Sequence, residues 1–260
     1  MIFRIPPETT LGQRAIISDI HANIDALEAV LKDIASKGIT EIYCLGDVIG
    51  YGPNPRECIL QARHFADCIR GNHEDALLFI AADFNMEAAR SIEWTRKQLN
   101  QKDRPKDENH SLWNFLGDLG DRVVEDRVLY IHGSPRVPTR EYVRPADCHD
   151  HEKIDEIFSM IDHLCFVGHT HEPGVFTPDH KFFFPKQLAN TWKVTEQKAL
   201  INVGSVGQPR DRDPRACYVT FDGEVIRYHR VPYDVESTMK KILAAKELPE
   251  YHALRLKDGR

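Results

Sequence analysis

The sequence predicts an α/β fold built on layered β-sheet. Strand-like and helix-like segments alternate at short intervals through the first third of the chain, which is the pattern of a sheet covered by helices. Of its 260 residues, 42% are hydrophobic and 28% are charged, as in an ordinary globular protein. A chain of this length buries about three quarters of its unfolded surface, so a substantial core is expected.

The first predicted elements follow from apolar runs and helix signals. Residues 15–20 are expected to form a buried strand, and Asn23 can cap a helix that continues to Gly38 at helical spacing. Residues 41–45 predict a second strand. After a turn rich in Gly and Pro and a short helix, residues 67–70 predict a third.

A polar, mostly helical stretch at about 81–116 is expected to be an insertion over one face of the sheet, with a charged linker at 101–110. This insertion either covers the site as a lid or only packs on the sheet. No linker rich in Pro, Gly or Ser divides the chain, so residues 1–260 are expected to form a single domain. Further strands are expected at 128–131, 163–167, 174–177, 198–202, 216–221 and 224–230, followed by a helix near Asp234.

Charge and cysteine usage exclude several classes of protein. The formal net charge is −6, so no overall positive field exists to hold a nucleic-acid backbone, and a long nucleic acid is not the expected partner. The six cysteines form no C-x-x-C pair, and we see neither a secretory leader nor an apolar run of about 18 residues. We therefore expect a cytoplasmic protein that does not cross a membrane.

Residues that can bind metal ions follow the apolar strands at the points where those strands end. Strand ends on one edge of a layered sheet converge, and alternate residues point the same way where the extended conformation persists. Two Asp carboxylates, one Asn carbonyl and four His exceed the needs of one ion but suit two ions that share a carboxylate, for which Asp47 is the best candidate. The set is Asp19, His21, Asp47, Asn72, His132, His169 and His171, with His73 beside it.

The types of donor restrict the metal. No cysteine lies among them, which argues against a structural zinc site. Mixed nitrogen and oxygen donors fit Mn, Fe, Co, Ni or catalytic Zn.

Together these residues resemble the calcineurin-like metallophosphoesterases. The resemblance covers residues 15 to about 207, and the segment from Asn202 to Pro209 is similar to the small bacterial phosphoesterase branch. It implies a four-layer α/β/β/α sandwich of two mixed β-sheets flanked by helices, with metal ions at the strand ends between them. The matching segments, in the family's order, are Asp19-Ile-His21, Gly46-Asp47, Gly71-Asn72-His73-Glu74, His132-Gly133 and Gly168-His169-Thr170-His171.

The resemblance also implies roles for these residues. One ion would be held by Asp19, His21, Asp47 and His171, and the other by Asp47, Asn72, His132 and His169. A hydroxide shared by the two ions would attack phosphorus, and His73 would give a proton to the leaving oxygen. The implied activity is hydrolysis of a phosphomonoester or phosphodiester of a small molecule or nucleotide, with Mn as the ion expected to activate best in an assay.

One motif departs from the Ser/Thr protein phosphatases of this superfamily. Those enzymes have an Asp that orients the catalytic His and an Arg that grips phosphate, where this chain has Gly50 and Tyr51. Protein phosphatase activity is therefore less expected, and the partner of His73 stays open. The candidate contacts to substrate are Arg70, Arg136, Arg210 and Tyr51, and Tyr51, Tyr142 and Trp113 either stack on a nucleobase or pack in the fold.

Three alternatives remain for the function. They are a non-catalytic metal-binding scaffold of the same fold, a protein Ser/Thr phosphatase and a dinucleoside polyphosphate hydrolase. The presence of His73 argues against the scaffold. The sequence selects neither the natural substrate, nor monoester or diester, nor the native metals, nor the oligomeric state.

Overall fold

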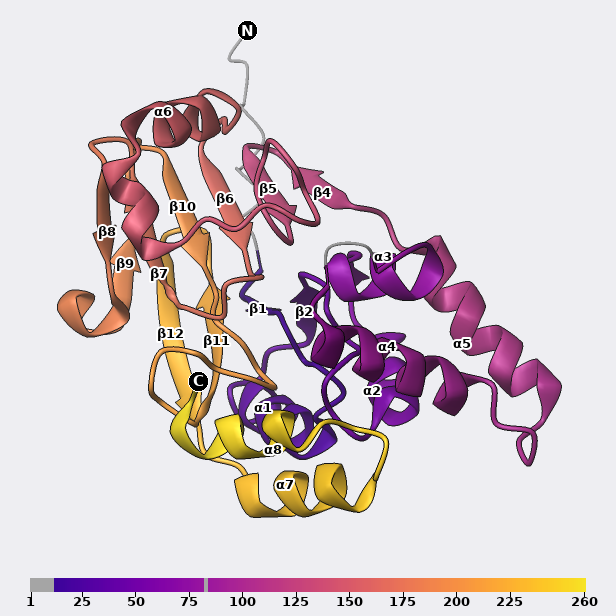
Figure 1. Ribbon diagram of the computed structural model, residues 1–260. Coiled ribbons are helices and arrows are strands. Elements are labelled where there is room, and N and C mark those ends of the chain that lie inside the picture. Colours follow the sequence, from indigo (N-terminus) through magenta and orange to yellow (C-terminus); the bar gives the residue numbers. More distant parts are fainter. Residues whose placement is uncertain (1–11, 82–83) are drawn as a thin grey trace, which may run out of the picture.

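The computed structural model describes residues 12–81 and 84–260, and two mixed β-sheets form its centre (Figure 1). Residues 82 and 83, near the start of the expected insertion, lie outside the described part. Each sheet has six strands in the described residues. Helices cover the outer faces of both sheets, so the expected four-layer α/β/β/α sandwich is confirmed.

The first sheet has the strand order β3-β2-β1-β11-β12-β9. Its first three strands are parallel, with Ala15 opposite Ile42, and β11, β12 and β9 continue it in antiparallel fashion. Strands from both ends of the chain thus share this sheet. The strands are β1 (Arg14–Ile17), β2 (Glu41–Cys44), β3 (Asp67–Cys68), β9 (Thr191–Lys193), β11 (Ala216–Phe221) and β12 (Val225–Val231).

The second sheet has the strand order β4-β5-β6-β10-β7-β8. Here β5, β6 and β10 are parallel, while β4, β7 and β8 pair in antiparallel fashion at the flanks. The strands are β4 (Arg122–Glu125), β5 (Val128–Ile131), β6 (Leu164–Val167), β7 (Gly174–Thr177), β8 (Lys181–Phe183) and β10 (Ala199–Asn202).

Alternation along each strand divides the hydrophobic core into layers. Ile16 packs with Phe166 in the core between the sheets, whereas its neighbours Ala15 and Ile17 pack in the cluster that the helices of the first sheet complete. On the far side, Ile154 and Ile157 of one helix cover the outer face of the second sheet. The strand ends that carry the polar residues are therefore held between rigid layers.

The helices begin where the capping residues predict. Asn23 accepts a hydrogen bond from the Ala26 amide at 3.1 Å, and Asp234 accepts one from the Ser237 amide at 2.9 Å. The helices are α1 (Ile24–Ser36), α2 (Pro55–Ala62), α3 (Asn72–Leu78), α4 (Met86–Leu99), α5 (Lys106–Asp118), α6 (His151–Ser159), α7 (Val235–Ala244) and α8 (Glu250–Leu254), with 3-10 turns η1 (Pro145–His149), η2 (Pro185–Leu188) and η3 (Arg255–Asp258).

The structure corrects two expectations about these elements. The strands β4, β8 and β9 were not predicted, because each lies at the edge of a sheet with partly exposed side chains and mixes charged or polar residues with apolar ones, so no buried apolar run marks it. The prediction of a charged linker at 101–110 is wrong for its second half, because α5 begins at Lys106. Asp107 and Glu108 lie in the first turn of that helix, where negative charge is favourable.

Among the described residues, no helix is both long enough and apolar enough to span a bilayer.

The core between the sheets predicts where the fold is most sensitive. Phe166 is fully buried there, so Phe166→Ala should lower the free energy of unfolding by about 3–5 kcal/mol. Val124 lies on β4 and is 64% exposed, so Val124→Ala should change it by no more than about 0.5 kcal/mol. Urea unfolding followed by circular dichroism measures both. Equal losses in the two variants would contradict this assignment of the core.

Candidate metal centre

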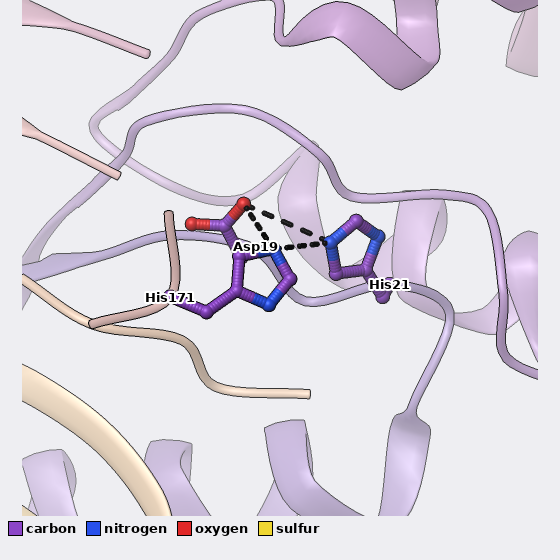
Figure 2. A group of neighbouring side chains, drawn as sticks. All are labelled: Asp19, His21 and His171. Carbon is purple, nitrogen blue, oxygen red and sulfur yellow. Dashed lines mark hydrogen bonds and ion pairs between the residues drawn. The ribbon is translucent and has the colours of Figure 1, made fainter. Parts of the chain in front are cut away.

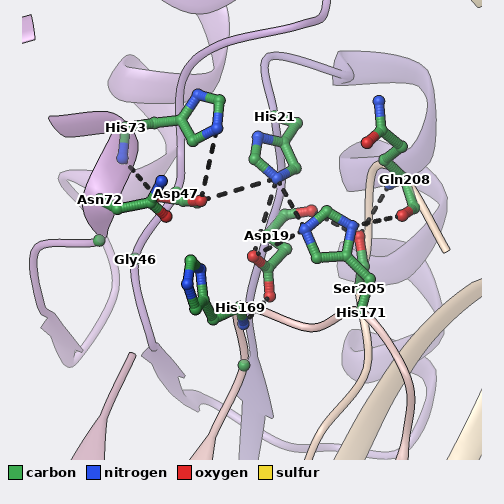
Figure 3. A network of polar contacts seen from close by, with 12 residues as sticks. Asp19, His21, Gly46, Asp47, Asn72, His73, His169, His171, Ser205 and Gln208 are labelled. Carbon is green, nitrogen blue, oxygen red and sulfur yellow. Dashed lines mark hydrogen bonds and ion pairs between the residues drawn. The ribbon is translucent and has the colours of Figure 1, made fainter. Parts of the chain in front are cut away.

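The seven predicted ligand residues and His73 are all buried, and they lie where strands of both sheets end. Figure 3 shows His73 and six of the seven, all but His132, gathered in one place. Strands β1 and β2 bring residues from the first sheet, and β5 and β6 bring residues from the second. The first turn of α3 adds two more. Asp19 and His21 follow β1, Asp47 follows β2, Asn72 and His73 begin α3, His132 follows β5, and His169 and His171 follow β6.

The backbone turns sharply at these residues, so the expected extended conformation does not persist through them. Asp19 and His21 have φ angles of 55° and 48°, and His169 and His171 have φ angles of 65° and 62°. This left-handed conformation is uncommon outside glycine, although Asp and His adopt it more readily than most residues. The turns, rather than strand alternation, bring the paired side chains together, and such strain is typical of functional sites.

Hydrogen bonds between the loops hold these turns. The amide of Asp19 donates to the Gly46 carbonyl at 3.0 Å, and the amide of His21 donates to the Asp47 carbonyl at 2.9 Å. The hydroxyl of Ser205 donates to the carbonyl of Asp19 at 2.8 Å. The Gly-Ser turn after β10 therefore fixes the backbone of Asp19, the first predicted ligand residue.

Glu74 is a positioning residue to which the sequence reasoning assigned no role. Its carboxylate accepts hydrogen bonds from the amides of Asp47 and Gly71 at 2.9 Å and of Ile49 at 3.2 Å. The two loops also touch directly, because a Cβ on Gly46 would lie 2.4 Å from the Gly71 nitrogen. The sequence could have indicated this role, because a Glu three residues after the N-cap residue, here Gly71, is typical of the capping box at the first turn of a helix.

The first group of metal-binding atoms comes from Asp19, His21 and His171 (Figure 2). The Nε2 atoms of the two histidines are 3.1 Å apart, and Asp19 Oδ1 lies 3.2 Å from His171 Nε2 and 3.7 Å from His21 Nε2. The other oxygen, Asp19 Oδ2, accepts a hydrogen bond from the His169 amide at 3.0 Å. Oδ1 is buried and accepts no hydrogen bond from any residue in the described part of the chain.

The second group comes from Asp47, Asn72, His132 and His169. His132 Nε2 lies 3.1 Å from both Asn72 Oδ1 and His169 Nδ1, and 3.4 Å from Asp47 Oδ2. The same Asp47 oxygen is 3.7 Å from Nε2 of His21 in the first group. Asp47 Oδ1, in contrast, accepts the His73 amide at 2.9 Å. One oxygen of Asp47 is thus held by the backbone, and the other lies between the two groups.

The chemistry of this donor set fits cations. Each ligand histidine has one ring nitrogen on a backbone carbonyl, which can only accept, so that nitrogen carries the proton and the other presents a lone pair. The lone pairs of His21 and His171 therefore face each other at 3.1 Å, as do those of His132 and His169 when neutral. The carbonyl partners are Ile49 for His21, Leu45 for His132, Arg140 for His169 and Gln208 for His171.

The pKa values of His132 and His169 also indicate that positive charge is favourable at this site. Burial lowers the pKa of His132, but the carboxylate of Asp47 outweighs it and raises this pKa to about 10. Burial lowers the pKa of His169 to about 3, to which the charge on His132 contributes. A proton on His132 therefore takes the place that a cation takes when one binds.

His73 lies next to Asp47, but no carboxylate in the described part of the chain bonds its other ring nitrogen, Nδ1. Its Nε2 is 3.9 Å from Asp47 Oδ2, while its Nδ1 is buried without a hydrogen bond among the described residues. Gly50 lies against this nitrogen with a φ of +86°, and a Cβ there would be 2.0 Å from Nδ1. The ring is held by packing instead: Tyr51 is 4.4 Å and Phe84 is 4.8 Å from it, centroid to centroid.

The structure adds His252, which sequence reasoning regarded as ordinary because it belongs to no motif. It comes from α8 and is 2% exposed. Its ring lies 4.7 Å from the ring of Tyr51, and its Nε2 lies 3.3 Å from the carbonyl of Glu87 on α4. No local sequence pattern predicts the position of His252, because only the tertiary fold brings α8 to the loop that carries Tyr51.

Of the three arginines predicted to contact phosphate, two are engaged elsewhere. Arg70 pairs with Asp75 at 2.6 Å, and Arg136 pairs with Glu141 and Glu156. Arg210 lies 5.9 Å from the Tyr51 ring, and its amide donates to the carbonyl of His171 at 3.3 Å.

The three aromatic residues predicted to stack or pack are divided by the structure. Tyr51 packs on His73, and Tyr142 stacks on His169 with ring centroids 3.7 Å apart. Trp113 lies on α5 and donates from its ring nitrogen to Asn100, away from the metal centre.

Comparisons with known proteins place the chain among relatives of similar sequence and fold. The chain is 36% identical over 254 residues to an uncharacterized protein of Methanocaldococcus jannaschii, an alignment that covers 95% of this chain and 98% of the relative. A metallophosphoesterase from Sphaerobacter thermophilus has a similar structure, with a TM-score of 0.77, 34% identity and coverage of 96% of this chain and 100% of that one. A hypothetical protein of Pyrococcus horikoshii shares the fold, with a TM-score of 0.75, 20% identity and coverage of 96% and 99%.

The match to a described family extends through both sheets. Residues 13–224 match the calcineurin-like phosphoesterase superfamily domain, and this range holds every one of the seven predicted ligand residues and His73. Phosphoesterases of this family depend on metal ions, in agreement with the groups of His and Asp side chains described above. The chain therefore belongs to the calcineurin-like phosphoesterase superfamily.

Proposed function

We propose that this protein hydrolyses a phosphoric ester of a small molecule or nucleotide at a centre that binds two divalent metal ions. The observation that carries the proposal is the convergence of buried donors into overlapping groups, with Asp47 Oδ2 lying 3.7 Å from His21 Nε2 on one side and 3.4 Å from His132 Nε2 on the other. Seven donor residues are more than one ion takes from a protein. A cytoplasmic location and manganese as the activating ion remain predictions.

The two groups define how the ions would be held. Asp19, His21, Asp47 and His171 would bind one ion. The second would be bound by Asp47, Asn72, His132 and His169. Such a pair of cations activates water and offsets the negative charge of a phosphoryl group during in-line attack.

His73 is proposed to protonate the leaving oxygen. Burial lowers the pKa of His73 to about 4, so the ring is neutral in the resting protein at neutral pH. A bound phosphate brings negative charge next to the ring, which raises this pKa and favours the imidazolium. Tyr51 and Phe84 fix the direction of the ring by packing.

Arg210 is the arginine best placed to bind the phosphate. Its Nη2 donates to Gln208 Oε1 at 2.9 Å, and its Nε is buried without a partner in the described residues. It also forms no ion pair with a described carboxylate, unlike Arg70 and Arg136. A guanidinium with donors to spare suits the planar, paired oxygens of phosphate.

The alternatives have less support. A non-catalytic scaffold does not need His73 buried beside the shared carboxylate. Protein phosphatase activity would rely on the carboxylate and arginine whose places are taken by Gly50 and Tyr51. Dinucleoside polyphosphates remain within the proposed class as nucleotide substrates.

Metal dependence is the first prediction of the proposed function. Protein stripped with a chelator should be inert and should recover hydrolysis of p-nitrophenyl phosphate or its bis-ester when Mn²⁺ is added. Asp47→Asn should bind fewer than two ions per chain by mass spectrometry, because the shared oxygen loses its charge. If fully remetallated protein stays inert on both esters and on nucleotides, the proposed function is wrong.

Removal of the proposed acid is the second prediction. His73→Ala should slow turnover of an alkyl phosphate by about 10²–10⁴-fold, the usual contribution of general acid catalysis. Hydrolysis of p-nitrophenyl phosphate should fall less, because that leaving group needs no proton. Metal content should match the unaltered protein, and a scaffold would show no change in either rate.

The third prediction separates the arginines. Arg210→Gln should lower kcat/KM by about 10–100-fold, the effect of losing a hydrogen bond between charged groups worth about 1.5–3 kcal/mol. Arg136→Gln should leave kcat/KM within about twofold, since this arginine pairs with Glu141 and Glu156. Steady-state kinetics on one ester decides between them, and a larger loss in the Arg136 variant would reverse the assignment.

A further inference from the structure

We propose that a slot beside the metal centre binds the organic group that leaves with the ester oxygen, and that this group is aromatic: an aryl ring or the base of a nucleoside. The slot has a volume of about 250 Å³. This inference rests on the proposed function, because it names the substrate class of the same site. Its walls are Tyr51, Ala76, Ile80, Phe84, Ala88 and Tyr142.

The slot is continuous with the metal centre. Asn72 and His169, two proposed ligands of one ion, also line it. On α3, Ala76 follows Asn72 by four residues and therefore lies on the same face, one turn away. A group attached to a phosphate at the metal centre can thus extend along α3 into the slot.

The position of His73 indicates which part of the ester enters. Its ring centroid is 4.4 Å from that of Tyr51 and 4.8 Å from that of Phe84, and both are walls of the slot. In hydrolysis the bond between phosphorus and the alcohol oxygen breaks with its electrons on that oxygen. Water supplies the new oxygen and loses a proton to solvent, while His73 gives a proton to the departing alcohol. The group beside His73 is therefore the leaving alcohol.

The walls are preformed and suit a flat ring. Tyr142 stacks on His169 with 22° between the rings, and the guanidinium carbon of Arg144 lies 4.5 Å from its centroid. Neither the hydroxyl of Tyr142 nor that of Tyr51 forms a hydrogen bond within the described ranges, so both can bind the polar edge of a ligand. Asn85 and Arg140 add polar groups to the lining beside the apolar and aromatic walls, and convergent polar groups of this kind fix the orientation of an organic ligand.

Two small residues make the room. Ala76 is 3% exposed and Ala88 is 5% exposed, and they face the slot from α3 and α4. A longer side chain at either position would occupy the volume that a ring needs. Because Ala88 belongs to the helical insertion, the insertion selects substrates by shape.

The test compares Ala88→Leu with Ala89→Leu. Ala89 is the next residue on α4 but lines a separate surface groove with Met86 and Trp94, so its variant adds the same atoms outside the slot. The substrates are phenyl phosphate, a nucleoside 5′-monophosphate and methyl phosphate, with Mn²⁺. Each rate is expressed relative to the unaltered protein, which cancels the intrinsic reactivity of the esters.

Ala88→Leu should lower kcat/KM for the phenyl or the nucleoside ester by about tenfold or more and leave methyl phosphate within about twofold, whereas Ala89→Leu should change none of them. The ester whose kcat/KM falls more shows whether the slot binds an aryl ring or the base of a nucleoside. Equal losses for methyl and aromatic esters, no loss for any ester, or equal effects of the two variants would overturn the slot.

A binding measurement separates this inference from the proposed function. Phenylphosphonate should bind the metal-loaded protein more tightly than methylphosphonate in calorimetry, and Ala88→Leu should abolish that preference. If no ester is hydrolysed but the preference is present and lost in the variant, the slot stands and the hydrolytic function fails. Absence of the preference in the unaltered protein overturns the slot. Should Ala88→Leu lower the Tm strongly, Ile80→Ser provides a second test, because Ile80 is a wall of the slot that is 73% exposed, and its loss should weaken the same preference.

Discussion

The metal centre depends on one electrostatic constraint: lone pairs and carboxylates converge in a buried space with too few protons between them. His21 and His171 face each other through Nε2 at 3.1 Å, and the nearby Asp19 Oδ1 has no hydrogen bond among the described residues. Backbone carbonyls fix the protons on the far side of each ring, so a simple tautomer change cannot relieve the opposition. Positive charge from outside the chain can relieve it, which favours a cation-binding site over a polar core.

The two sheets supply the rigidity that such an arrangement needs. A hydrogen bond from the His169 amide to Asp19 Oδ2 connects a loop of the second sheet to a ligand of the first. Ser205, after β10, supports the carbonyl of the same Asp19. Left-handed residues at the ligands raise the energy of the loops, and these contacts between sheets stabilise them. The core around Phe166 therefore serves the site by holding both sets of strand ends in register.

Sequence reasoning recovered the fold class and the central strands, and it named side chains that the structure buries close together, because apolar runs that end in Asp or His beside glycine are local signals. It missed β4, β8 and β9, whose three or four residues lie at the flanks of the sheets and carry little pattern. It also expected extended ligand segments, whereas φ angles above 45° at Asp19 and His21 come from the hydrogen bonds of neighbouring loops. Such tertiary contacts leave no trace in a local pattern.

The replacement of a carboxylate and an arginine by Gly50 and Tyr51 changes how the site controls its acid. A carboxylate on His73 Nδ1 would orient the ring and hold its pKa up, but the backbone of Gly50 occupies that side. Packing against Tyr51 now orients the ring, and Tyr51 in turn rests on His252 from the C-terminal helix. Among the described residues no hydrogen-bond partner holds Nδ1, so the negative charge that favours protonation of His73 lies on the Nε2 side, where Asp47 is 3.9 Å away. Orientation by apolar contact and stabilisation of the charged ring therefore come from different sides of His73, and the aromatic walls that provide the first also bound the slot for the leaving group.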